Sequence, residues 1–445
     1  MSATPFDSLL YGELLSDAQV AAELDDAAQL RALLEVEAAL AKAEGDCGVI
    51  PEDAARQIAT VAEKLTIDPA NLAAATARDG IPVPALVAAL RAAVGGEAAS
   101  FVHWGATTQD VMDSGLVLRL RKILNLLDQR LTRLCETLNE KAVAGRDTVM
   151  TARTRGQQAT PTTLGLKMAG WLAPLQRHRA RLAELRPRLE VLSFGGASGT
   201  LAALCGQAGS DDAMAVEAAL ARHLHLTVAP LPWHNQRDGL IELAGWLALA
   251  TGSLGKIAGD VILLAQNEVG ELREGDGGSS STMPQKSNPV HSEATLALAR
   301  LNAGLAGQMQ LTALHNHERD GAAWQQEWLG LPQMLLACGA ALNHMNALMD
   351  GLRIDTERMR ANLEASNGLV LAEAASFALS RHLPRAKAQG LVKQACREVA
   401  ETGRHLFDLL AEASDAPIDW QALRDPAQHT GASRQLIERA LKNPH

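Results

Sequence analysis

The chain has 445 residues, of which 47% are hydrophobic and only 3% aromatic, and its net charge is −10. This length and apolar content allow a large core, so they exclude a largely disordered protein and predict two or three domains. The acidic balance argues against binding to nucleic acid or anionic membranes. Five widely spaced cysteines without a C-x-x-C pair indicate reduced thiols and a cytoplasmic protein. We expect neither a signal peptide nor a membrane-spanning segment.

Apolar residues recur at helical spacing along most of the chain. The first such stripe lies in residues 30–43 and ends before Gly45. A longer one runs from Leu116 to Leu138 in steps of four and three, and the sequence GRD at 145–147 ends it. Such spacing predicts two amphipathic helices, the second of more than six turns.

Two further segments, 238–268 and 291–314, are rich in Ala, Leu and Gly on nearly every face. A helix that is apolar all round must be surrounded, inside a large bundle or at a subunit interface. We find no alternating strand pattern with hairpin signals, so we expect an all-α fold. The expected organisation is an N-terminal helical domain (1–104), a central long-helix bundle (105–350) carrying a loop at 275–290, and a C-terminal helical domain (351–445).

Four polar stretches interrupt the helices and gather groups that a bundle core would not hold. The first, HWGATTQD, starts at His103 and contains Gly105, which breaks the regular backbone. A new helix is expected to begin at Thr107, Thr108 and Gln109. Free N–H groups and hydroxyls there suit a carboxylate, although an ordinary N-cap explains them equally well. His103 alone is more typical of a packed histidine.

Two more polar stretches hold cationic and amide side chains. TARTRGQQATPTT offers Arg153, Arg155 and Gln158, and an exposed connection is its plainer interpretation. PWHNQRD stands just before an apolar helix and makes His234 and Arg237 candidates for contact with a ligand. Both stretches are therefore candidate parts of a binding site.

The fourth stretch is DGGSSSTMPQKSNPV, within the loop 275–290. Its flexible glycine–serine half followed by a proline-fixed half is typical of a lid, although a linker has a similar composition. Lys286 supplies positive charge for a developing enolate and Asn288 an amide donor. A serine here acts as a base if that lysine and backbone N–H groups stabilise its alkoxide. The chain contains no G-x-S-x-G, H-E-x-x-H or phosphate-loop motif, and we expect no metal site.

The residues of this loop also carry a resemblance. SSTMPQKSNP (280–289) resembles the signature of the fumarase/aspartase superfamily, G-S-S-x-x-M-P-x-K-x-N-P with minor spacing variants, and GATTQD and RTRGQQATP resemble its first and second segments. FGGASGTLAAL, WHNQRD, HERDGAAWQQEW and GLVLAEA resemble one branch, the bacterial 3-carboxy-cis,cis-muconate cycloisomerases. The similarity runs along nearly the whole chain.

The resemblance implies an all-helical, three-domain subunit without metal or organic cofactor. It also implies a homotetramer whose long helices form a shared bundle and whose active sites are built from three subunits. The implied substrate is a small dicarboxylate or tricarboxylate. In this branch one carboxylate of 3-carboxy-cis,cis-muconate adds to a double bond and gives 4-carboxymuconolactone, in the protocatechuate branch of aromatic catabolism.

The resemblance also implies roles for individual residues. Ser280 matches the serine that acts as acid or base at carbon, and Lys286 and Asn288 match the residues that hold the carboxylate. The substrate-binding candidates, from the stretches above and from this match, are His103, Thr107, Thr108, Gln109, Arg155, Gln158, Arg237, Ser281 and Arg319.

Several positions depart from the superfamily pattern. Arg155 stands where lyases usually have a histidine, and Gln158 where some members have one, so we interpret Gln158 as a binding residue. Ser287 lacks the positive charge common in the branch, and Ser279 replaces a glycine. These changes leave the substrate open. The alternatives are a 3-sulfomuconate cycloisomerase, a fumarate-releasing β-elimination lyase like adenylosuccinate lyase, or an inactive helical scaffold.

Overall fold

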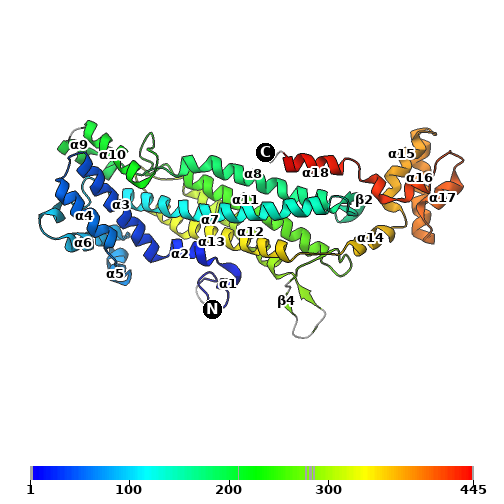
Figure 1. Ribbon diagram of the computed structural model, residues 1–445, viewed down its shortest axis with the longest axis horizontal. Helices are drawn as coiled ribbons and strands as arrows, with labels where there is room; N and C mark the ends of the chain where they lie inside the picture. The colour runs from blue at the N-terminus through cyan, green and yellow to red at the C-terminus, as the bar shows by residue number, and fades with distance from the viewer. Residues whose placement is uncertain (1–3, 209, 276–277, 280–282, 284–285, 443–445) are drawn as a thin grey trace. The chain divides into compact units, whose positions relative to one another are not determined.

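The computed structural model describes residues 4–208, 210–275, 278–279, 283 and 286–442 (Figure 1). Helices dominate these residues, which confirms the all-α prediction. Their α-helices are α1 (Gly12–Leu15), α2 (Ala18–Leu24), α3 (Asp26–Asp46), α4 (Glu52–Lys64), α5 (Ala70–Asp79), α6 (Val83–Val94), α7 (Thr108–Ala144), α8 (Leu164–Leu189), α9 (Ala202–Ala208), α10 (Ser210–Leu224), α11 (Asp238–Leu264), α12 (Val290–Leu311), α13 (Gly321–Gly351), α14 (Thr356–Glu364), α15 (Ala372–Ser380), α16 (Arg385–Thr402), α17 (Leu406–Ala413) and α18 (Ser433–Lys442). Their strands are β1 (Val149–Thr154), β2 (Gln157–Thr163), β3 (Leu272–Arg273), β4 (Gly278–Ser279), β5 (Ser287–Asn288) and β6 (Arg353–Ile354).

The chain divides into two compact units, each of them assembled from three segments. Unit 1 comprises Met1–Arg130, Arg179–Gly252 and Ala297–Leu342. Unit 2 comprises Leu131–His178, Ser253–Leu296 and Asn343–His445. These boundaries group residues differently from the division at 104 and 350, and the three-domain organisation stays a prediction.

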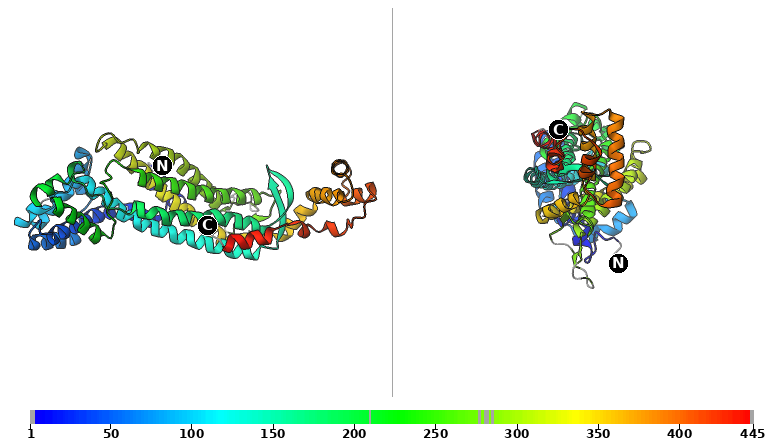
Figure 2. Two further views of the ribbon diagram at one scale, coloured as in Figure 1. Left: turned by 90° about the horizontal axis from the view of Figure 1, so that it is seen from above. Right: turned by 90° about the vertical axis from the view of Figure 1, so that its right-hand side faces the viewer.

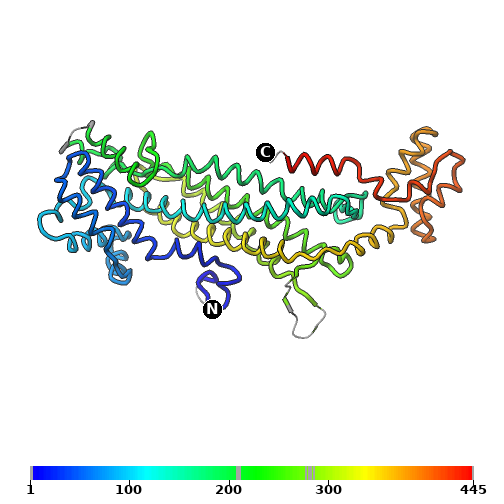
Figure 3. Tube along the Cα trace, viewed as in Figure 1, coloured from blue at the N-terminus to red at the C-terminus, as the bar shows by residue number. Residues whose placement is uncertain are grey.

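The core of unit 1 gathers around α3, which packs against α4 and α10 (Figures 1 and 3). Asp25 caps the start of α3 by accepting a hydrogen bond from the Ala28 amide at 2.6 Å. Leu33 and Leu40 of the predicted stripe are 2% and 1% exposed. A side chain at Gly45 would bring its Cβ within 2.5 Å of Ala55, so only glycine allows α3 and α4 to approach this closely.

The long predicted stripe is helix α7, which begins at Thr108 and ends at Ala144, as the sequence indicates. Leu120, Leu127 and Leu138 of that stripe are fully buried. At about 25 cal/mol for each Å² of apolar surface, each buried leucine contributes about 2 kcal/mol.

Unit 2 has its own apolar core among α15, α16 and α17, the orange helices of Figure 2. Leu379, Phe407 and Leu410 are fully buried there. The rings of Phe407 and Trp420 lie 5.5 Å apart between centroids. Between α17 and α18 the chain forms turns and two short 3-10 helices, Ala422–Arg424 and Pro426–His429, in agreement with the turn-rich composition of residues 412–430.

A β-hairpin replaces the polar connection that we expected within residues 151–163. Strands β1 and β2 pair antiparallel, and Thr154 lies opposite Gln157. The two residues between them, Arg155 and Gly156, have φ values of 53° and 78°, as the two central residues of a type I′ turn require. Threonines fit a pleated, half-buried surface, so this segment pairs as strands although it lacks alternating apolar residues.

Helix α11 is the one helix of the described residues that is long and apolar enough to cross a membrane by length and composition. From the sequence we expected no membrane-spanning segment. Its most apolar window has a mean hydropathy of 1.5 and is 50% buried. A core helix meets the same criteria, and Leu249 and Leu263 on its uncovered face are 56% and 57% exposed within this single chain.

Candidate active site

The start of α7 holds the first group of predicted site residues. The backbone reaches it through His103 and Gly105, with φ values of 60° and 69°. A Cβ at Gly105 would lie 2.4 Å from Leu204, so the turn requires glycine. Thr107 and Thr108 are partly exposed, and neither hydroxyl forms a hydrogen bond within the described part of the chain. Both hydroxyls can therefore donate to a ligand.

Asp110 fastens this turn to two loops that are remote in sequence. Its carboxylate is 2% exposed and accepts the amide hydrogens of Thr107, Gly195 and Gly196 at 2.9, 2.8 and 3.0 Å. The ring nitrogen Nε2 of His234 lies 2.7 Å from Asp110 Oδ1. His234, a candidate ligand contact from the sequence, is therefore a buried structural partner of Asp110.

Gln109 is fully buried, and all of its amide group is engaged. Its Nε2 donates to Asp113 Oδ2 at 3.1 Å and to the His234 carbonyl at 2.8 Å. Its Oε1 accepts a hydrogen bond from Arg319 Nε at 2.7 Å. Both polar atoms of the side chain are thus engaged within the described residues, and the contact between Gln109 and substrate stays a prediction. Gln109 positions Arg319.

Arg319 keeps most of its donors available. Its guanidinium donates to Gln109 Oε1 through Nε and to the Ala197 carbonyl through Nη2 at 3.4 Å. The other N–H groups of its five are unengaged within the described residues. The neighbouring Asp320 caps α13 by accepting from the Ala323 and Ala322 amides, and the bonds from Ala323 and then from Asn316 are the main causes that lower its pKa to about 2. Arg319 is thus a partly exposed cation held at one edge by Gln109.

Arg237 lies at the centre of a buried charge network with Asp113 and Glu327. The three side chains are 0%, 1% and 1% exposed. Nη1 and Nη2 of Arg237 donate to Asp113 at 2.7 and 3.0 Å. Nε and Nη2 donate to Glu327 at 2.7 and 2.6 Å, and Nη1 also reaches the Trp233 carbonyl at 3.5 Å.

This arrangement uses all five N–H groups of Arg237. Within the described residues the guanidinium has no donor left and no exposed surface, and the role of Arg237 as a substrate anchor stays a prediction. Burial disfavours its charge, but Asp113 and then Glu327 outweigh that effect and raise its pKa. Burial raises the pKa of Glu327, and Arg237 opposes the shift. Arg237 neutralises acids that would otherwise be costly to bury.

His103 forms the remaining predicted contact of unit 1. Its Nδ1 lies 2.6 Å from Glu37 Oε1, and the two side chains are 14% and 1% exposed. Burial by itself lowers the pKa of His103, but the Glu37 carboxylate outweighs it, so the pKa is raised. The protonated imidazole is therefore the form that Glu37 stabilises.

We expect His103→Gln to destabilise the fold more at pH 6 than at pH 9. The pKa of His103 is higher in the folded protein than in the unfolded chain, where it is about 6.5. Protonation of His103 therefore stabilises the fold fully at pH values below about 6.5. This stabilisation is lost as the pH rises through the pKa of the folded protein. The loss at pH 6 should be about 1.5–3 kcal/mol, the range for a charge-assisted hydrogen bond. Urea unfolding at both pH values measures it, with the exposed His382→Gln as control. An equal loss at both pH values would contradict the assignment.

Unit 2 holds the other predicted residues. Arg155 and Gln158 are both exposed, Arg155 in the turn of the β1–β2 hairpin and Gln158 on β2. Beneath them Arg153 forms a two-point pair with Glu271 at 2.7 and 2.9 Å, and Glu271 is fully buried. Asn362 also donates to Glu271 at 2.8 Å. The hairpin is therefore fixed through Arg153, while Arg155 and Gln158 stay open to a ligand.

The described ends of the loop 275–290 are held in place. Strands β4 and β5 pair so that Gly278 lies opposite Asn288. Glu274 is 6% exposed and accepts from the Ser292 amide and hydroxyl at 2.9 and 2.6 Å, which caps the start of α12. Lys286 is exposed and Asn288 partly exposed. The predicted base Ser280 and its neighbour Ser281 lie outside the described residues.

The predicted residues are divided between the two units, and within the described residues a printed contact joins Arg319 to Gln109 beside Thr107 and Thr108. Thr107, Thr108 and Arg319 are available in unit 1, and Gln109 supports Arg319 from behind. The available group of unit 2 consists of Arg155, Gln158, Lys286 and Asn288. Within each unit the groups are cationic, hydroxyl or amide donors, which suits a substrate with several carboxylates.

Sequence reasoning missed the acids that organise unit 1. Asp110 and Asp113 stand three residues apart at the start of α7, where acids usually interact only with the helix N-terminus. Glu327 lies in a segment that resembles the superfamily, but nothing in its spacing indicates burial. The available signal was Arg237 itself, because a buried arginine requires acidic partners.

Comparison with known proteins identifies the family that this chain resembles over its whole length. The lyase family model matches residues 12–302, and a model described as the adenylosuccinate lyase C-terminus matches residues 368–440. A 3-carboxy-cis,cis-muconate cycloisomerase of Pseudomonas aeruginosa is 45% identical over 100% of this chain and 98% of its own. The crystal structure of a 3-carboxy-cis,cis-muconate lactonizing enzyme from Pseudomonas putida superposes with a TM-score of 0.91 at 40% identity, covering 98% of both chains. That of a fumarate lyase from Mesorhizobium superposes with a TM-score of 0.90 at 36% identity, covering 96% of this chain and 98% of that one.

Proposed function

The chain belongs to the lyase family of the fumarase/aspartase superfamily, and on this premise we propose that it is a cycloisomerase of 3-carboxy-cis,cis-muconate. The product would be 4-carboxymuconolactone, formed in the protocatechuate branch of aromatic catabolism. Two features support the proposal: full-length similarity to cycloisomerases, and donor groups that suit a substrate with three carboxylates.

The chemistry is an intramolecular addition. One carboxylate oxygen of the muconate bonds to a carbon of a double bond, and the electron pair of that bond moves toward the neighbouring carboxylate. The resulting enolate-like dianion then takes a proton at carbon, so the lactone is an isomer of the substrate. The dianion needs a dense set of donors because charge develops on a group that is already negative.

We assign the proton transfer at carbon to Ser280 and the stabilisation of the dianion to Lys286 and Asn288. This assignment rests on the match of these positions to the superfamily signature. The exposed side chain of Lys286 and the strand pairing beside Asn288 agree with a role in contacting substrate. Ser281 stays a candidate for substrate binding by the same match.

The unit 1 residues supply the other carboxylate contacts. Thr107 and Thr108 offer free hydroxyls at a helix start, and Arg319 offers its unengaged N–H groups. Gln109 positions Arg319 through a direct hydrogen bond, and Arg237 positions Gln109 through Asp113. The observation that carries this assignment is the Arg319–Gln109 hydrogen bond, because it fixes the orientation of the Arg319 guanidinium. The remaining N–H groups of Arg319 have no partner among the described residues.

The proposed assembly is a cytoplasmic homotetramer whose active sites are shared between subunits, without metal or organic cofactor. The exposed leucines Leu249 and Leu263 of α11 and Leu301 of α12 support this assembly, because such apolar faces need partners. Sharing would also bring the unit 2 donors of one subunit to the unit 1 donors of another.

A second candidate function is release of fumarate from a succinyl-type substrate by β-elimination. The structural match to a fumarate lyase favours it, as does the uncharged Ser287 in the signature loop. The same enolate-like intermediate would form, but the leaving group would be a separate molecule.

An ultraviolet assay separates the two candidates. Muconates absorb through their conjugated double bonds, and lactone formation removes this conjugation. We expect the absorbance of 3-carboxy-cis,cis-muconate to fall on addition of enzyme, and that of 3-sulfomuconate to fall more slowly. Fumarate production from succinyl-type substrates while both muconates remain intact would overturn the proposal.

A further inference from the structure

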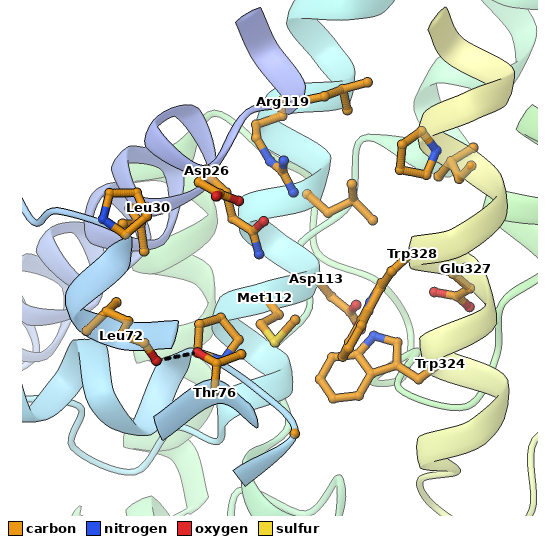
Figure 4. A pocket seen from close by; sticks show the side chains of 18 of the residues that line it. Asp26, Leu30, Leu72, Thr76, Met112, Asp113, Arg119, Trp324, Glu327 and Trp328 are labelled. Atoms are coloured by element: carbon orange, nitrogen blue, oxygen red, sulfur yellow. Dashed lines mark hydrogen bonds between the residues drawn. The ribbon is translucent and has the colours of Figure 1, made fainter. Parts of the chain in front are cut away.

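Unit 1 contains a cavity of about 610 Å³ that lies apart from the donors assigned to the substrate (Figure 4). Its walls come from α3, α5, α7 and α13. Thr107, Thr108 and Arg319 are not among its lining residues. A cavity of this size has room for a small organic ligand.

One end of the cavity carries a buried cation, Arg119 of α7. Arg119 is 9% exposed, and its Nε has no hydrogen-bond partner in the part of the chain that the structure describes. Figure 4 shows its guanidinium directed from α7 into the space between the helices. Burial lowers its pKa to about 10, although Glu23 and Asp25 act in the opposite direction. A buried arginine without a hydrogen-bonded acid is costly, and an anionic ligand would supply that partner.

The other end of the cavity is aromatic and aliphatic. Trp324 and Trp328 of α13 line it with ring centroids 5.1 Å apart and ring planes at 65°. Leu72 and Met112 face them from α5 and α7 in Figure 4. Two indole rings set edge to face suit a flat aromatic body.

Three acids line the cavity together with Arg119, and Figure 4 shows one of them, Asp26, beside Arg119. Asp113 and Glu327 also line the cavity, but both bind Arg237, which neutralises one of their two charges. Asp26 is exposed to solvent. Arg119 is the one cation among the described residues that line the cavity, so a carboxylate binds best beside it and an apolar body beside the tryptophans.

We propose that this cavity binds an aromatic monocarboxylate, with its carboxylate on Arg119 and its ring against the sides of Trp324 and Trp328 that line the cavity. The occupant also contacts Asp113 and Glu327, so it touches the network that holds Arg237 and, through Gln109, Arg319. The site is distinct from the substrate donors, and its existence does not depend on the reaction proposed above.

Isothermal titration of the full-length protein with 4-phenylbutyrate tests the site. Wild type should bind the acid, and the neutral amide 4-phenylbutyramide should bind about 10-fold or more weakly, because it forgoes a charge-assisted hydrogen bond. Arg119→Gln should weaken acid binding by about the same factor and leave amide binding nearly unchanged. Arg133→Gln removes the same charge from a position on α7 whose side chain is 65% exposed, and should bind like wild type.

A second variant tests the site independently, in case Arg119→Gln does not fold. Ala73→Phe fills the cavity from an exposed position of α5 and leaves all charges intact, so it should abolish binding of both probes. The proposal is overturned if wild type binds neither probe, if Arg119→Gln binds the acid as wild type does, or if Ala73→Phe leaves binding unchanged.

Discussion

We expect Ser280→Ala to lower kcat by about 10²–10⁴-fold while changing KM little, because general acid–base groups contribute about this much and act mainly in the transition state. Removing a hydroxyl leaves in place the carboxylate contacts that we propose for Lys286 and Asn288. Steady-state kinetics with 3-carboxy-cis,cis-muconate gives both constants.

Ser380→Ala is the matched control for this variant. Ser380 lies in α15, and its hydroxyl donates to the Ser376 carbonyl within the same helix at 2.7 Å. Its loss should leave kcat unchanged within a factor of about two. If Ser280→Ala keeps near-wild-type turnover, Ser280 is not the proton carrier and the base must be another group.

Replacement of Arg237 should have the largest effect on stability. We expect Arg237→Met to lower the free energy of unfolding by about 3–5 kcal/mol, because it leaves Asp113 and Glu327 buried together without a counter-charge. Urea denaturation measures this loss. Catalysis should fall as well, since Asp113 also holds Gln109, which positions Arg319.

Two further variants distinguish this explanation from loss of packing. Arg188→Met breaks an exposed pair with Glu242, with side chains 56% and 42% exposed, and should cost less than about 1 kcal/mol. Adding Glu327→Gln to Arg237→Met should recover part of the loss, since one uncompensated charge disappears. Additive losses in the double variant would show that charge compensation is not the role of Arg237.

The helices were predictable because the apolar residues that a helix buries recur at helical spacing in the sequence. The stripe through Leu120 and Leu127 predicts α7, and the sequence GRD predicts its end at Ala144. The β1–β2 hairpin was missed because its strands consist mostly of polar residues. Its pairing depends on the two-residue turn at Arg155 and Gly156, which strand periodicity does not report.

The candidate site was predictable as a set of loops but not as a set of contacts. Polar composition located the segments that contain Thr107 and Arg319, and motif resemblance located Ser280. The sequence did not show that Gln109 and Arg237 face inward, because their partners Asp113 and Glu327 are distant along the chain and become neighbours only through folding. Long charged or amide side chains look alike in a sequence whether they bind a ligand or one another.

Identification of the product by proton NMR tests the central claim most directly. The wild-type enzyme is incubated in turn with 3-carboxy-cis,cis-muconate, 3-sulfomuconate and a succinyl-amine substrate. We expect the first to be converted to a lactone of the same composition at the highest kcat/KM, with no fumarate from the third. Fumarate from the third substrate together with unreacted muconate would contradict the assignment as a cycloisomerase.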